Sequence, residues 1–170
     1  MMETIEAIKT RRSIRSYLEK NIDQNQIMSL LECAMYAPSA HNQQSWQFVI
    51  IDDKGLLQTI SWFHQWIAMA KEAPVGILIC GDLSKDVAGW FWIQDCSAAT
   101  QNLLLAAHDS GLGAVWTGVY PQKEIMEQFS SLFDLPEHIV PFAFVPVGYP
   151  ATPGKAGNRF KQEKVHINKR

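Results

Sequence analysis

One short apolar run, Val75–Cys80, constrains the fold of this chain more than any other feature of its sequence. A strand that is exposed on one face alternates apolar and polar side chains, whereas this run shows no such alternation. Its length and composition predict a strand that is buried on both faces, at the centre of a sheet. The chain is therefore expected to form a layered domain around that sheet.

Further strands and one long helix follow from similar patterns. Trp46–Ile51 is rich in aromatic and β-branched residues and predicts a strand, and residues 114–119 predict another. Phe142–Val147 predicts a strand at the edge of the sheet, because Pro146 cannot donate a hydrogen bond to a neighbouring strand. Ile93–Ser110 is apolar on more than one side, which predicts a central helix packed against several partners.

Shorter helices and a polar tail complete the predicted fold. The first helix is expected at Glu3–Thr10, with Ile5 and Ile8 facing inward. The other expected helices run from Asp23 to Pro38, from Leu56 to Lys71 and from Pro121 to Phe133. Gly148–Arg170 is poor in apolar residues, and such a tail on a small domain often lies over a neighbouring chain. We therefore expect one α+β domain over residues 1–170, with a central mixed or antiparallel sheet of four to five strands flanked by helices.

Composition excludes several classes of protein. The 170 residues suit one domain, and 15 basic against 17 acidic residues argue against a general nucleic-acid binder. Cys33, Cys80 and Cys96 fit neither a disulfide framework nor a metal site, and Cys33 and Cys80 are expected to be buried thiols. The N-terminus does not resemble a signal peptide and no apolar run is long enough to span a membrane. A cytoplasmic location is expected.

The common motifs for side-chain catalysis and nucleotide binding are missing from the sequence. It contains no GxSxG, no GxGxxG and no GxxxxGK[ST], and its five histidines never pair at the spacing of a zinc site. If the chain is an enzyme, we therefore expect its reactive atom to belong to a bound cofactor.

The strongest local signal is the basic cluster Arg11-Arg12-Ser13-Ile14-Arg15. Arginine binds phosphate in a bidentate manner, and in an extended segment Arg11, Ser13 and Arg15 would face one side. The cluster therefore predicts an anion site. A solvated basic face and a nucleic-acid patch remain alternatives, although one short cluster offers few phosphate contacts.

Three weaker candidates lie elsewhere in the chain. The loop from Pro38 to Trp46 carries polar groups just before a strand, but such residues are also ordinary in turns. Gly118 ends the segment Trp116-Thr117-Gly118, where a ligand could approach the backbone closely. Arg159 lies in the polar tail and could equally be surface charge.

Taken in order along nearly the whole chain, these pieces resemble the FMN-dependent nitroreductase family in its short form. The motifs that carry the resemblance are Arg11–Arg15, Pro38–Trp46, Ala73-Pro74-Val75, Gln94-Asp95, Gln101–Ala107, Gly111-Leu112-Gly113 and Val147–Pro150 followed by Arg159. Ser45 departs from the family, which usually has proline there, and this change is expected to loosen the entry to the strand. The Lys169-Arg170 ending also departs, because short relatives often end in an aromatic residue.

The resemblance implies a homodimer with an exchanged C-terminal tail and two FMN sites, each built from both chains. Arg11, Ser13 and Arg159 would hold the phosphate, and Arg15 would lie nearer the ribityl chain or the N1/O2 edge. Pro38, Ser39, Ala40 and Asn42 would come from the other subunit, and Thr117 and Gly118 would offer backbone N–H groups near flavin N5. Arg12 and Gln44 are also expected at the cofactor. Trp90, Phe91 and Trp92 are expected to line the substrate pocket, with core packing as the alternative.

The activity that the resemblance implies is an oxidoreductase in which NADH or NADPH passes a hydride to flavin N5. Nitroaromatics, quinones or similar electron-poor acceptors would then be reduced in a ping-pong cycle, with no catalytic side chain and no metal. Charge near N1 and N5 tunes such a flavin. Three alternatives remain open: a flavin-storing or flavin-sensing protein without turnover, a dehalogenase or enone reductase, and a flavin-fragmenting enzyme like the dimethylbenzimidazole-forming relative.

Overall fold

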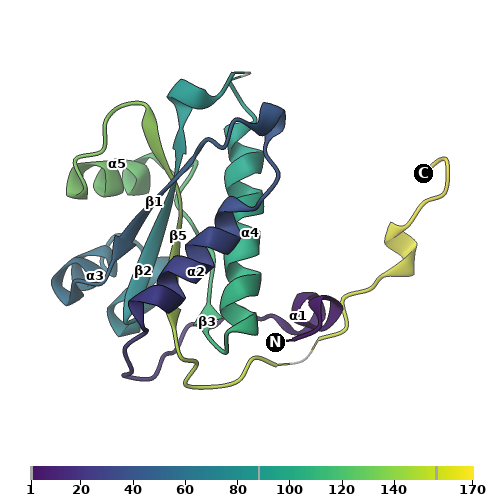
Figure 1. Cartoon of the computed structure of the whole chain (residues 1–170), viewed down its shortest axis with the longest axis horizontal. Helices are drawn as coiled ribbons and strands as arrows, with labels where there is room; N and C mark the ends of the chain where they lie inside the picture. The colour runs from purple at the N-terminus through teal and green to yellow at the C-terminus, as the bar shows by residue number, and fades with distance from the viewer. Residues whose placement is uncertain (1, 88, 156) are drawn as a thin grey trace.

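The computed structural model describes residues 2–87, 89–155 and 157–170, and its centre is an antiparallel sheet (Figure 1). The strands are β1 (Trp46–Ile51), β2 (Val75–Asp82), β3 (Gly113–Ala114), β4 (Thr117–Gly118) and β5 (Ile139–Gly148). Their order is β1-β2-β5-β3, and β4 also pairs with β5. The predicted α+β fold is confirmed, and of the two sheet types that the sequence left open, mixed or antiparallel, the structure has the antiparallel one.

Helices cover both faces of this sheet. They are α1 (Thr4–Thr10), α2 (Gln24–Met35), α3 (Lys54–Ile60), α4 (Trp92–Asp109) and α5 (Lys123–Leu132), with 3₁₀ turns η1 (Ala40–Asn42), η2 (Gln65–Glu72), η3 (Leu83–Lys85) and η4 (Gln162–Lys164). Within β2, Ile77 and Ile79 join the core formed with α2 and α4, whereas Leu78 and Cys80 join the core formed with α3 and α5. All eight residues of β2 are buried. The predicted central strand with two buried faces is therefore confirmed.

The prediction that the proline-containing strand lies at an edge is wrong. β5 pairs with β2 on one side and with β3 and β4 on the other. The register sets Ala114 opposite Val147 and Thr117 opposite Phe144, so Val115 faces Pro146 in the gap between β3 and β4. Because Pro146 has no N–H to donate, the ladder between β5 and residues 114–119 is interrupted at Val115, while β5 itself stays continuous. Residues 114–119 therefore form two strands rather than one.

Three other local expectations are also corrected. The helix expected over residues 56–71 ends at Ile60, and a separate 3₁₀ segment, η2, follows it. In α1 the buried residue is Ala7, whereas Ile5 and Ile8 are 63% and 53% exposed. Cys33 is exposed, while Cys80 and Cys96 are buried as thiols whose pKa burial raises, to about 12 for Cys80.

The C-terminal tail first follows the N-terminal segment and then leaves the body of the molecule. The Ala151 amide donates to the Ser16 carbonyl at 3.0 Å, and Arg12 Nε donates to the Lys155 carbonyl at 2.7 Å. The described residues beyond this point are exposed, and Figure 1 shows them extending away from the helices. In the described residues, no helix is both long enough and apolar enough to cross a membrane.

Candidate functional site

The basic cluster lies in an extended segment that runs beside β3. Ser13 forms a bridge with Ala114, and the Ile14 amide donates to the Ala114 carbonyl at 3.0 Å. Ile14 packs so closely against Gly113 that a Cβ on that glycine would lie 2.7 Å from it. Ser13 and Arg15 are exposed, so the alternation expected from the sequence is present: Ile14 faces the protein, and its two neighbours face solvent.

The structure brings Arg159 from the tail towards the basic cluster at the end of α1: a Cβ built on Gly157 would lie 3.6 Å from Arg12 Nη2 and 4.0 Å from Arg159 Nε. Partial burial, the positive charge of Arg159 and that of Arg12 together lower the pKa of Arg11. The same neighbourhood acts on His108, whose pKa is lowered first by burial and then by Arg11 and Arg12. Positive groups that lie close together repel one another, which makes their charged forms less stable. A bound anion would offset this repulsion, because an opposite charge favours the protonated forms.

Arg12 is engaged by the chain itself. Its Nη1 donates to the Lys9 carbonyl at 2.8 Å and to the Arg11 carbonyl at 2.7 Å, while its Nε bonds Lys155 as described above. Its side chain also packs against Gly154, where a Cβ would lie 2.4 Å from Arg12 Cβ. Arg12 therefore fastens the tail to the end of α1, whereas Ser13 and Arg15 are exposed and Arg11 is half-buried.

The second predicted element, around Gly118, forms an open position at the same edge of the sheet. Thr117 is buried, and its hydroxyl donates to the Phe144 carbonyl. Gly118 is exposed, and a Cβ built there would meet no heavy atom within 4 Å. Because a strand rises roughly 3.3 Å per residue, Gly118 lies about 13 Å along this edge from Ala114, which pairs with Ser13. The edge thus leads from the arginines to an uncovered stretch of backbone.

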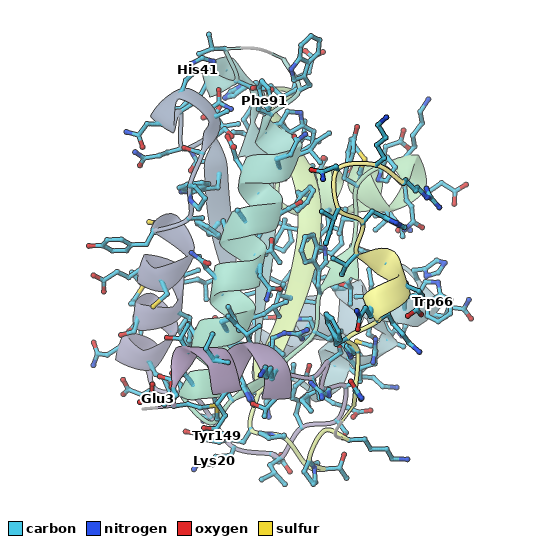
Figure 2. All side chains as sticks on the ribbon, turned by 90° about the vertical axis from the view of Figure 1, so that its right-hand side faces the viewer. Glu3, Lys20, His41, Trp66, Phe91 and Tyr149 are labelled. Carbon is cyan, nitrogen blue, oxygen red and sulfur yellow. The ribbon has the colours of Figure 1, made fainter. Side chains whose placement is uncertain are left out.

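The loop from Pro38 to Gln44 lies elsewhere, at the opposite end of α4. His41, Asn42 and Gln44 adopt left-handed backbone conformations, with φ of 52°, 53° and 47°. Figure 2 shows His41 and Phe91 at one end of the molecule and Glu3 of the N-terminal segment at the other. Thr10 bonds His108 at the C-terminal end of α4, whereas Ala40 bonds Asp95 at its N-terminal end. At 1.5 Å per residue, about 20 Å of helix separates Asp95 from His108.

Asp95 is the residue at this end whose importance sequence reasoning missed. Asp95 is 3% exposed, and its carboxylate accepts hydrogen bonds from the Ala40 amide at 2.9 Å, Gln43 Nε2 at 2.7 Å and Ser45 Oγ at 3.3 Å. The available signal was an aspartate at the start of an apolar helix. Ser45 is fully buried and its carbonyl accepts from the Asp82 amide, and the expected loosening of the strand entry stays a prediction.

The aromatic residues expected to line a pocket divide into two kinds. Trp92 belongs to the core: it is 5% exposed and makes edge-to-face contacts with Tyr120 at 5.0 Å and Phe142 at 6.0 Å between ring centroids. Its prediction as a pocket wall is therefore wrong, because the start of α4 turns this side chain towards Gly81 in β2. Trp90 and Phe91 are exposed and adjoin the loop end of α4. Among the described residues, no group of three or more His, Cys, Asp and Glu side chains could hold a metal ion.

Comparison with known proteins gives the family of this chain. The model of the nitroreductase family matches residues 8–68 and 60–149. The chain belongs to the nitroreductase family. It is 45% identical over 168 residues to a Methanothermobacter thermautotrophicus protein named "Putative NADH dehydrogenase/NAD(P)H nitroreductase", a match that covers 99% of this chain and 88% of that protein.

Solved structures of nitroreductases share the whole architecture. An FMN-dependent nitroreductase from Clostridium difficile superposes with a TM-score of 0.89 at 30% identity, covering 97% of this chain and 99% of the other. A Desulfovibrio desulfuricans protein described as a "putative nitroreductase" was solved in complex with FMN. It superposes with a TM-score of 0.86 at 29% identity, covering 99% of this chain and 98% of that one. The nitroreductase fold predicted from the sequence is confirmed.

Proposed function

We propose that this nitroreductase is an FMN-dependent NAD(P)H oxidoreductase that reduces electron-poor acceptors such as nitroaromatics and quinones. The observation that carries the proposal is the convergence of Arg11 and Arg159 at one end of a sheet edge whose other end, at Gly118, is open. Relatives of the same family, one of them solved with FMN, support this reading of the site.

The residues along this edge fit the parts of FMN in sequence. A phosphate needs charge-assisted donors, and Arg11, Arg159 and the exposed hydroxyl of Ser13 would supply them. The flavin ring needs flat, uncovered backbone, which Gly118 offers because it lacks a Cβ and has no neighbour where one would be. Arg15 is exposed on the same side as Ser13, where its guanidinium could face the ribityl chain or the N1/O2 edge of the ring.

When bound, FMN would supply the redox chemistry by taking a hydride from NAD(P)H and delivering it to the acceptor. The residues of this chain would bind the phosphate, hold the ring against the backbone at Thr117 and Gly118, and place positive charge near the ring. They would not need to move a proton themselves. This division of labour explains why the sequence carries none of the common catalytic motifs.

The two halves of the expected site do not meet within one chain. The arginines lie by β3 and the far end of α4, whereas Pro38, Ser39, Ala40, Asn42 and Gln44 precede β1 at the opposite edge of the sheet. We propose that a second copy of the chain supplies the loop, as in a two-fold dimer, where each subunit presents the same surface to the other.

Two exposed apolar features suit this dimer. Ile5 and Ile8 project from α1, and a groove of about 380 Å³ lies between α1, α2 and α4, lined in part by Ala7, Cys33 and Leu105. The tail carries three exposed apolar side chains, Phe160, Val165 and Ile167. Exchange of the tail between subunits would cover such groups, which cost free energy when left in water.

The test is the visible absorbance spectrum of the purified protein, reconstituted with FMN and then titrated with NADH or NADPH without oxygen. A yellow protein that bleaches, and regains its colour when a quinone or nitroaromatic is added, is the expected result. A yellow protein that stays oxidised would favour flavin storage or sensing. A protein that binds no FMN would contradict the proposal.

A further inference from the structure

The loop from Ser39 to Ser45 contains three residues in the left-handed region of backbone conformation. His41, Asn42 and Gln44 all have positive φ, a region that residues other than glycine seldom adopt, although Asn and His adopt it more often than Gln does. Local bonds account for part of this shape, since Ser39 Oγ accepts from the Gln44 amide at 3.1 Å and Asn42 Oδ1 accepts from Gln44 Nε2 at 3.0 Å. Strained backbone persists where surrounding structure determines it, so a stronger anchor is required.

That anchor is the buried carboxylate of Asp95, in the first turn of α4. It binds the loop at three separate points: the backbone of Ala40 and the side chains of Gln43 and Ser45. Bonds to a charged acceptor are stronger than those between neutral groups, and burial of Asp95 keeps water from competing for them. The rigid, 18-residue α4 thus fixes where the loop stands.

Gln43 extends the same network to a second loop. Its Nε2 is 2.7 Å from Asp95 Oδ2 and 3.0 Å from Asp86 Oδ1, and its Oε1 accepts from the Val87 amide at 3.2 Å. Asp86 is 9% exposed, and its Oδ2 has no hydrogen-bond partner. Two buried carboxylates therefore share one amide group, which joins the 39–45 loop to the segment that leads to Trp90 and Phe91.

We propose that Asp95 is a positioning residue for the flavin site: acting through Gln43, it holds the 39–45 loop in the shape that completes the site of the partner subunit. The proposal rests on the proposed function, because it gives the loop a cofactor to meet. Asp95 is buried and bonds the loop, so it would act on the flavin site through the loop. Its removal should therefore weaken FMN binding without altering the arginines that bind phosphate.

The test compares Asp95→Asn with a matched control, Asp82→Asn. Asparagine keeps an acceptor for the Ala40 amide but turns an N–H towards the N–H of Gln43. Asp82 is also a buried carboxylate nearby, but it accepts from Ser84 and Gln47 instead of from the loop side chains. Loss of one charge-assisted bond corresponds to about a tenfold effect. We expect Asp95→Asn to raise the dissociation constant of FMN about tenfold, whereas Asp82→Asn leaves it unchanged within about twofold.

A second variant separates the polarity of this network from its packing. The triple change Asp95→Asn, Gln43→Glu and Asp86→Asn reverses every donor and acceptor between these side chains, and the carboxylate introduced at position 43 can still accept from the Val87 amide. We expect it to recover most of the lost FMN affinity. Equal weakening in Asp95→Asn and Asp82→Asn, or no recovery in the triple variant, would overturn the proposal.

A readout on the protein without FMN keeps the two proposals distinguishable. Amide hydrogen exchange of residues 39–45 should be faster in Asp95→Asn than in the natural protein or in Asp82→Asn. If the natural protein bound no FMN, the proposed function would fail, while the exchange result would still decide whether Asp95 positions the loop. Unchanged exchange in Asp95→Asn would refute the positioning role even if FMN bound normally.

Discussion

The two ends of helix α4 differ in the charge of the side chains around them. At the C-terminal end, His108 lies among Arg11 and Arg12, and Arg11 in turn lies near Arg159. At the N-terminal end, the buried Asp95 and Asp86 hold a strained loop through Gln43. At the first end, the acidic Asp109 and Glu6 also act on His108. At the second end, buried carboxylates accept hydrogen bonds from the loop. Under the proposed function, the first end would take the anionic part of the ligand, and the loop at the second end would meet the partner subunit.

Removing the charge at the arginine end should have the largest effect. Arg11→Ala combined with Arg159→Ala deletes two charge-assisted contacts to phosphate, which together contribute about 3 kcal/mol or more. FMN affinity should fall by at least about a hundredfold, measured by flavin fluorescence titration. Lys161→Ala with Lys164→Ala removes the same charge from the exposed tail and serves as the control. Comparable losses in both double variants would mean that overall charge, and not this cluster, binds the flavin.

A side chain added at Gly118 tests whether this open position meets a ligand or packs against other protein atoms. Because no protein atom lies within 4 Å of the position of a Cβ, Gly118→Val should leave the melting temperature almost unchanged. It should still weaken FMN binding about tenfold, because the valine would occupy space intended for the ring. Calorimetry of the protein without FMN and a fluorescence titration measure the two effects. A large loss of stability with normal FMN affinity would reverse this assignment.

The smallest of the expected effects is that of His108 on how stability changes with pH. The lowered pKa of His108 in the folded chain means that the unfolded chain takes up the proton first as the pH falls. The stability contributed by neutral His108 is therefore full above about pH 6.5 and is lost as the pH drops towards the lowered value. In His108→Gln, the urea denaturation midpoint should change less between about pH 7 and pH 5 than in the natural protein. Bound FMN should make the two proteins more alike, because its phosphate would favour protonated His108. If the urea midpoint changed with pH equally in both proteins, His108 would not be part of the basic cluster.

The sequence predicted the centre of this molecule better than its periphery. The buried faces of Val75–Cys80 depend on local composition alone, and β2 is buried as expected. The edge position of Phe142–Val147 was inferred from one missing donor at Pro146, but the neighbouring strand breaks at that point and so accommodates the proline. The exposure of Ile5 and Ile8 could not be predicted from the sequence. Helical spacing identifies the apolar face of α1 but does not say whether the same chain or another one covers that face.

The candidate site shows the same division. The alternation of Arg11, Ser13 and Arg15 follows from extended backbone and was predictable. The role of Asp95 depends on contacts across 50 or more residues of sequence, to Ala40, Gln43 and Ser45, which no local pattern contains. Trp92 was misplaced because the sequence alone cannot tell which side of a helix start faces the sheet.

Subunit complementation tests the central claim, that each flavin site takes its arginines from one chain and its loop from another. The arginine variant (Arg11→Ala, Arg159→Ala) and a loop variant (Ser39→Ala, Asn42→Ala) would each be prepared, mixed, unfolded together and refolded. In a mixed dimer, one site would combine the intact arginines of the loop variant with the intact loop of the arginine variant. Random pairing should restore about a quarter of the natural number of FMN sites. A mixture that binds no more FMN than the sum of its two components would contradict the account.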